Sequence, residues 1–360
     1  MKIAPNPLFL IGSQRSGTTW VANVLNRSRE VALFFEPLQK GLTLFQDFPE
    51  EPVHVQAPSE ALSADFVRAF HAMLQLEETF LNHRLVRLPK APAVLNAVLQ
   101  TPAAWAVLSK INRLRNLQVV NQFRTRNFAS HFVPKNAVVR PLVKETRLHL
   151  KLPLLLRAFP DTRIGVLVRH PYPVIQSATR WMARGSLGEL RRKLAYFFDV
   201  YETQVSLQTP RFRQLLELAR TGTVSDKLLA HWLISNELAY AFCQQHAASA
   251  RVVFYEALCR RPVDEFRRLF EFFGLGFDQE VREAILQTSA ASEGTDDLME
   301  TRRASQTKYK EWVTADLQSD KLYQKIVYFS EEFETLAQMQ KHYQDVLPTG
   351  AAATTGKLGS

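Results

Sequence analysis

The fold is decided by one stretch near the N-terminus, Pro7-Leu8-Phe9-Leu10-Ile11-Gly12-Ser13-Gln14-Arg15-Ser16-Gly17-Thr18-Thr19-Trp20. Residues 8–11 are apolar and predict a buried strand, residues 12–17 predict a tight loop, and residues from 18 onward predict the first turn of a helix. Such a loop directs backbone N–H groups and the positive end of a helix dipole at one point. The stretch therefore predicts a phosphate-binding loop within an α/β fold.

The two glycines of this loop are spaced as in the phosphate loop of nucleotide-binding proteins. In that loop a lysine follows the second glycine, whereas here Thr18 follows Gly17. The positive charge lies instead inside the loop, at Arg15. This departure indicates a loop that binds phosphate but does not hydrolyse ATP.

A second informative segment covers residues 164–181. Residues 164–168 are mostly branched and apolar, as in a strand covered on both faces, and Pro171 and Pro173 end that strand. A helical pattern follows and contains Ser177. Arg169 is thus expected at the carboxyl end of a central strand, where open α/β sheets bind ligands.

These two segments resemble the cofactor-binding segments of the sulfotransferases that use 3′-phosphoadenosine 5′-phosphosulfate (PAPS). The first segment of that family reads basic, Ser, Gly, Thr or Ser, Thr or Ser, aromatic, and residues 15–20 fit it at every position. In the second segment of the family, an arginine that ends the strand and a serine eight residues later bind the 3′-phosphate. The resemblance implies a cofactor site made of Ser13, Gln14, Arg15, Ser16, Gly17, Thr18, Thr19, Trp20, Arg169 and Ser177, with PAPS as sulfuryl donor and no metal.

An apolar run at residues 31–35 ends in Glu36-Pro37. In carbohydrate-type sulfotransferases the corresponding strand ends in Phe-Glu-Pro, and the glutamate is the proposed general base. The resemblance implies that Glu36 accepts the proton of the acceptor hydroxyl, while Arg15 stabilises charge on the leaving phosphate. The alternative is that Glu36 pairs with an arginine and only organises the loop.

Two further segments fit a sheet. Residues 138–143 predict a strand that precedes Lys144, and this lysine either faces the active site or forms a surface salt bridge. Residues 251–275 predict a strand, a turn and an amphipathic helix, and they resemble the family's Tyr-Glu-Asp-Leu segment. Ala257 stands where the family has Asp, and Tyr255 with Glu256 is expected to be structural.

A basic segment near the C-terminus, residues 302–312, resembles the loop that covers the 3′-phosphate in the family. Arg302 and Arg303 are therefore further candidates for cofactor binding. A solvated run of charges is the other interpretation of this segment.

Composition limits the possible partners. The 360 residues include 45 Lys and Arg against 35 Asp and Glu, and the net charge of +10 favours anionic ligands such as PAPS or an acidic acceptor. No zinc-finger spacing or regular basic stripe indicates nucleic acid, and the two cysteines show no metal-site spacing. No run of about 20 apolar residues predicts a membrane span, and the first strand begins too early for a signal peptide, which predicts a cytoplasmic protein.

The resulting prediction is an α/β protein with a P-loop-type central parallel sheet flanked by helices. A single sulfotransferase domain is expected over residues 1–347, with a helical insertion at about 38–135 that covers the active site and a disordered tail at 348–360. The predicted reaction is sulfuryl transfer from PAPS to an acceptor hydroxyl, on a carbohydrate or glycoconjugate. A divergent P-loop kinase or nucleotide phosphotransferase, a sulfotransferase acting on small molecules, lipids or tyrosine, and a silent binding protein remain alternatives. The oligomeric state stays open.

Overall fold

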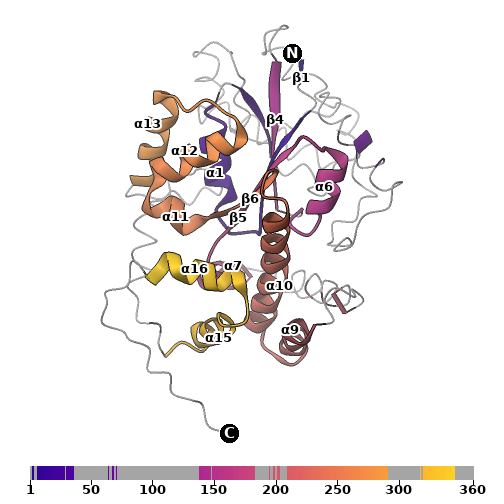
Figure 1. The fold of residues 1–360 in the computed structure, drawn as a ribbon. Coiled ribbons are helices and arrows are strands. Elements are labelled where there is room, and N and C mark those ends of the chain that lie inside the picture. Colours follow the sequence, from indigo (N-terminus) through magenta and orange to yellow (C-terminus); the bar gives the residue numbers. More distant parts are fainter. Residues whose placement is uncertain are drawn as a thin grey trace, which may run out of the picture.

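The computed structural model describes residues 2–3, 6–28, 30–35, 138–146, 148–182, 209–290 and 319–344, together with positions 64, 67, 68, 70, 194, 198, 201, 202 and 317. Within this part of the chain, six strands form a parallel sheet (Figure 1). They are β1 (Lys2–Ile3), β2 (Leu8–Gly12), β3 (Val31–Phe35), β4 (Val138–Glu145), β5 (Arg163–Val168) and β6 (Ala250–Phe254). The strands predicted from the sequence are confirmed.

The order of the strands places β2 in the middle of the sheet. The central path runs β4-β2-β5-β6, and both β3 and the short β1 pair with β4. Ile11 of β2 lies opposite Glu145 of β4 on one side and opposite Val166 of β5 on the other. Because all pairs are parallel, the carboxyl ends of β4, β2 and β5 meet at one edge of the sheet, next to the point where the strand order reverses.

Ten helices are described, and some of them cover the two faces of the sheet. In Figure 1, α1, α12 and α13 lie on one side of the strands, and α6 and α10 lie on the other. Their bounds are α1 (Thr18–Leu25), α6 (Leu152–Ala158), α7 (Pro171–Met182), α9 (Pro210–Thr221), α10 (Val224–Gln245), α11 (Tyr255–Arg260), α12 (Pro262–Phe273), α13 (Gln279–Ala290), α15 (Lys321–Phe329) and α16 (Glu334–Gln344). This arrangement confirms the predicted fold class.

Burial explains why these segments form these elements. All five residues of β2 are buried, as expected for a central strand covered by helices on both faces. In α12, Phe266, Leu269, Phe270 and Phe273 are buried at helical spacing, so the helix presents one apolar face. That face packs on β5, where Gly165 lets the Phe273 ring approach closely, because a Cβ atom there would lie 2.9 Å from its Cζ.

One position of the predicted insertion contributes to the core. The Phe70 ring is fully buried and lies 5.5 Å from the ring of Phe9 in β2 and 5.2 Å from that of Phe159. Phe70 is therefore part of the hydrophobic core around β2. The rest of the insertion apart from positions 64, 67 and 68, and the tail at 348–360, lie outside the described residues.

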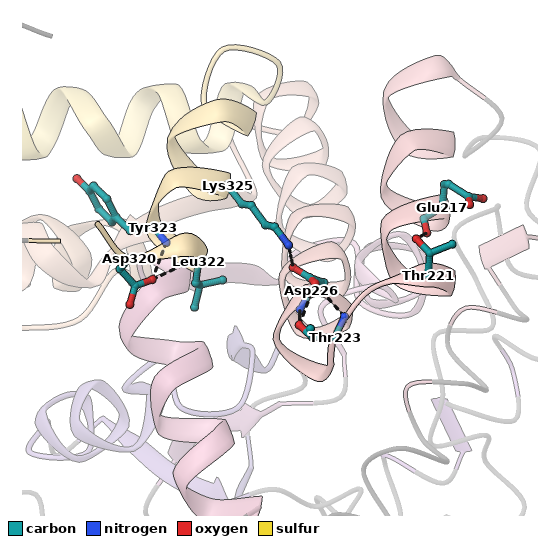
Figure 2. Close-up of polar contacts among 8 residues, drawn as sticks. All are labelled: Glu217, Thr221, Thr223, Asp226, Asp320, Leu322, Tyr323 and Lys325. Carbon is teal, nitrogen blue, oxygen red and sulfur yellow. Dashed lines mark hydrogen bonds and ion pairs between the residues drawn. The ribbon is translucent and has the colours of Figure 1, made fainter. Parts of the chain in front are cut away.

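A polar contact holds α15, one of the C-terminal helices, against α10. Thr223 and Asp226 form a capping box at the start of α10, and Lys325 of α15 binds the same Asp226 carboxylate (Figure 2). Each oxygen of this buried carboxylate is satisfied, one by Lys325 and the other by Thr223. The contact therefore fixes α15 against the helix that covers one face of the sheet.

Candidate functional site

The phosphate-binding loop has the strand, turn and helix geometry that the sequence predicts. β2 ends at Gly12, and α1 begins at Thr18 after a turn in which the Ser16 N–H donates to the Ser13 carbonyl at 3.2 Å. Gly17 is the N-cap of α1 and supplies no side-chain oxygen to the first turn. The amide groups at this helix N-terminus therefore remain suited to an anion.

Two residues of the loop adopt left-handed backbone angles. Gly17 has φ 97° and Arg15 has φ 69°, and Arg15 is the one non-glycine residue with positive φ in the described part of the chain. A Cβ atom at Gly17 would lie 2.5 Å from Cε2 of Tyr255, so position 17 accepts only glycine without movement of that ring. Strain at a non-glycine residue such as Arg15 is typical of functional loops.

The two predicted cofactor segments meet in one hydrogen-bonded cluster. Arg15 Nε donates to Ser177 Oγ at 2.9 Å, and Arg169 Nη1 donates to the Arg15 carbonyl at 3.1 Å. The Arg169 guanidinium lies over the Tyr255 ring at 4.5 Å from its centroid, and Trp232 Nε1 donates to the Arg169 carbonyl at 3.1 Å. Arg15, Arg169 and Ser177, which are far apart in the sequence, thus form one site; which ligand they bind stays a prediction.

Buried polar atoms without a partner gather at this edge of the sheet. Five such atoms among the described residues are buried and make no hydrogen bond. They are Ser13 Oγ, Ser16 Oγ and Arg169 Nε, together with Thr146 Oγ1 and His149 Nε2 in the turn after β4. A buried polar group without a partner costs about 1–3 kcal/mol, so native proteins keep few of them. Their concentration at the ends of β2, β4 and β5 indicates a site built for a polar ligand.

An aromatic wall borders the phosphate-binding loop on the side of α11 and α12. The Trp20 ring packs edge-on against Tyr255 at 5.8 Å and Phe266 at 5.2 Å, and its Nε1 donates to Thr288 Oγ1 at 3.0 Å. Burial raises the pKa of Tyr255, so its hydroxyl stays protonated. The sequence predicts a structural role for Tyr255, and no motif around Thr288 in α13 marks that residue.

A second set of contacts holds the start of α7 in place. The His170 N–H donates to Glu256 Oε1 at 2.9 Å, and the Tyr172 N–H donates to His170 Nδ1 at 3.2 Å. The Tyr172 hydroxyl donates to Asp320 Oδ2 at 3.0 Å, and Figure 2 shows the other oxygen of Asp320 capping α15 next to Tyr323. Burial, helped by the neighbouring Arg169 charge, lowers the pKa of His170 to about 3. Contacts from Glu256 of α11 and from Asp320 at the start of α15 therefore hold the turn that carries Arg169 in place.

Lys144 at the end of β4 is 2% exposed, so the surface salt bridge considered from the sequence is wrong. Glu145, beside it, is fully buried and accepts a hydrogen bond from the Thr146 N–H at 2.7 Å. Both residues lie on the strand next to the phosphate-binding loop. Lys144 thus lies at the same edge of the sheet as the candidate site.

Three predicted site residues, Glu36, Arg302 and Arg303, lie outside the described residues. Within the described ranges, no group of three or more His, Cys, Asp and Glu side chains could hold a metal ion. None of the helices in the described ranges has the length and apolar character needed to cross a membrane.

Solved structures that align with this chain were found at low sequence identity. Mouse sulfotransferase SULT7A1 in complex with PAP is 12% identical, with a TM-score of 0.41 over 96% of this chain and 90% of that one. The sulfotransferase domain of the curacin biosynthetic pathway is 16% identical, with a TM-score of 0.41 over 94% and 99% of the two chains. Retinol dehydratase in complex with retinol and PAP is 14% identical, with a TM-score of 0.33 over 96% and 81%.

A search of curated proteins gave no match. Residues 7–221 match the model of the sulfotransferase family, and these residues contain both the phosphate-binding loop and the Arg169–Ser177 segment. The match covers more than half of the 360 residues. The protein therefore belongs to the sulfotransferase family.

Proposed function

We propose that this sulfotransferase transfers the sulfuryl group of PAPS to an acceptor hydroxyl on a carbohydrate or glycoconjugate. The observation that carries the cofactor part is the cluster at the ends of β2 and β5. There, two arginines and a serine are already linked, and Ser13 Oγ, Ser16 Oγ and Arg169 Nε have no partner among the described residues. A ligand with an anionic group at each end, reaching from one strand end to the other, would satisfy these groups.

The 3′-phosphate of PAPS fits the β5 side of this cluster. The Arg169 guanidinium is oriented by the Tyr255 ring and by the Arg15 carbonyl. Its Nε has no partner among the residues that the structure describes and can donate to a phosphate oxygen. Ser177 Oγ accepts a hydrogen bond from Arg15, so its own proton can be donated to the same phosphate. Arg169 and Ser177 are therefore the proposed 3′-phosphate ligands.

The phosphosulfate fits the loop of residues 13–19. Ser13 and Ser16 carry hydroxyls there that have no partner in the described part of the chain, and Thr18 and Thr19 lie in the first turn of α1. The ribose joins the two phosphate ends, and the purine that it carries would extend toward Trp20 and Tyr255. In this pose, all parts of the cofactor lie between β2, β5 and the aromatic wall.

The reaction is an in-line displacement at sulfur. The acceptor oxygen forms a bond to sulfur while the bond from sulfur to the 5′-phosphate oxygen breaks, and adenosine 3′,5′-bisphosphate (PAP) leaves. Arg15 stabilises the charge that grows on the leaving oxygen, and Glu36, which is the proposed base, takes the proton of the acceptor hydroxyl. The carbohydrate acceptor is supported by the resemblance of Phe35-Glu36-Pro37 to carbohydrate-type sulfotransferases.

A titration of thermal stability with PAP tests the cofactor proposal. At about 100 times its Kd, a ligand that binds only the folded protein adds about 2.7 kcal/mol, which raises the Tm of a chain of this size by about 3–4 °C. We expect this shift for the wild type and its loss in Arg169→Ala. The matched control is Arg163→Ala, since Arg163 at the other end of β5 also lies over an aromatic ring, Phe272, and also binds a carbonyl.

The control should keep the full PAP shift. A shift with ATP and magnesium but none with PAP would reject PAPS as donor. An equal loss of the PAP shift in both variants would show that Arg169 acts through stability and does not bind the phosphate.

A further inference from the structure

The turn after β4 carries polar groups that the cofactor pose does not use. Thr146 and His149 form this turn, in which His149 Nδ1 lies 3.3 Å from the Thr146 carbonyl oxygen. Thr146 is 6% exposed. Its Oγ1 and His149 Nε2 are buried and have no hydrogen-bond partner in the part of the chain that the structure describes.

This turn lies on the opposite side of β2 from the proposed 3′-phosphate ligands of β5 and α7. β4 lies on one side of β2 and β5 lies on the other. The proposed phosphate ligands come from the ends of β2 and β5, so PAPS extends from β2 toward β5. Neighbouring strands are about 4.8 Å apart, which puts the β4 turn beside the phosphosulfate but away from the 3′-phosphate.

The hydrogen bond to Thr146 fixes the tautomer of His149. A carbonyl oxygen can only accept, so Nδ1 must carry the proton of the neutral ring and Nε2 must present a lone pair. Burial lowers the pKa of His149 to about 4; the hydrogen bond to Thr146 opposes this effect, and the positive charge of Lys151 adds to it. Near neutral pH, His149 Nε2 is therefore an uncharged hydrogen-bond acceptor.

Besides the charged Lys151, a polar aromatic pair from another part of the chain lies beside His149. The ring of His231 in α10 lies 6.0 Å from that of His149, and Tyr201 Oη lies 2.9 Å from His231 Nδ1. The next residue of α10, Trp232, binds the Arg169 carbonyl, so this part of α10 reaches the edge of the sheet where the candidate site lies.

We propose that Thr146 and His149 bind an uncharged hydroxyl group of the acceptor beside the transferred sulfuryl group. His149 Nε2 accepts a hydrogen bond from that hydroxyl, and Thr146 Oγ1 forms a second one. Both are positioning residues, and the subsite favours a neutral alcohol such as a sugar hydroxyl over a carboxylate, which could not donate to Nε2. This inference rests on the proposed function, because the cofactor pose defines which side is left for the acceptor.

Imidazole nitrogen NMR of the histidine-labelled, PAP-saturated protein tests the subsite. His149→Asn identifies the His149 signals among those of the nine histidines, and its side chain can keep the contact to the Thr146 carbonyl. We expect His149 to be the Nδ1-protonated tautomer, with a lone pair at Nε2. Glycerol, added to molar concentration as a small uncharged hydroxyl probe, should shift the Nε2 signal, whereas acetate should not.

Variants then assign the second hydrogen bond. Thr146→Val keeps the shape of the side chain and removes its hydroxyl, and we expect glycerol binding to weaken about fivefold, the ratio for a typical net hydrogen bond. Thr221→Val, on the exposed end of α9, is the matched control and should bind glycerol as the wild type does.

Failure of this inference can be told apart from failure of the proposed function. If PAP stabilises the protein but His149 is the Nε2-protonated tautomer, or glycerol leaves Nε2 unmoved, the subsite is wrong and the cofactor site stands. If acetate replaces glycerol as the effective probe, the acceptor class is wrong. If PAP itself does not bind, the proposed function fails first.

Discussion

His170 should make the folded protein sensitive to mild acid. The side chain is 3% exposed, and its Nδ1 accepts a hydrogen bond from the Tyr172 N–H. Burial and the adjacent Arg169 charge lower the pKa of His170 from the ordinary 6.5 to about 3. A proton on the ring would remove the acceptor at Nδ1 and place a second positive charge beside Arg169.

The sign and size of the effect follow from these two pKa values. The unfolded chain binds a proton at position 170 below about pH 6.5, while the folded protein does not until the pH approaches about 3. Stability therefore falls as the pH drops through this window. Each pH unit below about 6.5 lowers the free energy of unfolding by about 1.4 kcal/mol. About pH 5 lies about 1.5 units below that value, so the protein is about 2 kcal/mol less stable there than at about pH 8.

Urea unfolding at about pH 8 and about pH 5 measures this loss. In His170→Asn, the amide oxygen can still accept from the Tyr172 N–H but cannot be protonated. This variant should show a pH difference about 2 kcal/mol smaller than the wild type. His149 and His231, whose pKa values burial also lowers, contribute equally to both proteins and cancel in the comparison.

His246→Asn is the matched control, because this histidine is exposed at the end of α10. It should keep the wild-type difference between the two pH values. The reasoning is refuted if His170→Asn loses as much stability between about pH 8 and about pH 5 as the wild type does.

Two substitutions test the loop and the attachment of α15. Gly17→Ala should lower the free energy of unfolding by about 3 kcal/mol, because the positive φ disfavours alanine and its Cβ meets the Tyr255 ring. Tyr255→Leu in the same protein should recover the part of this loss that comes from the ring. No recovery would contradict the contact. Asp226→Ala should lower the free energy of unfolding, measured in urea, by about 2 kcal/mol. Asp226→Asn should lower it less, because Asn keeps an acceptor for the Thr223 N–H and loses only the charge facing Lys325. Equal losses in the two variants would mean that the cap contributes nothing.

The strands and the two phosphate segments could be predicted because their signals are local. An apolar run followed by two correctly spaced glycines defines β2 and its loop, and Pro171 marks the point where β5 ends and α7 begins. The position of Arg169 at a strand end follows directly from that boundary. Its contact with Arg15 could be inferred only because parallel strands bring their carboxyl ends to one edge.

Other parts of the site depend on contacts that no local pattern encodes. Tyr255 resembles a structural residue in its own segment, yet packing of β6 beside β5 brings its ring onto Gly17 and Arg169. Thr288 reaches Trp20 only because α13 packs on α1. His149 gave no signal, since a single histidine between leucines is usually a core residue.

The central place of β2 also affects when the protein can become functional during synthesis. Leu8 pairs with Leu142 and Arg163, so the first long strand to leave the ribosome must wait for both of its neighbours. Pairings so distant in the sequence form slowly, and until they form an apolar strand remains open to aggregation. A nascent chain that ends before β5 should therefore depend on chaperones and bind no PAP, although its phosphate-binding loop has already been translated.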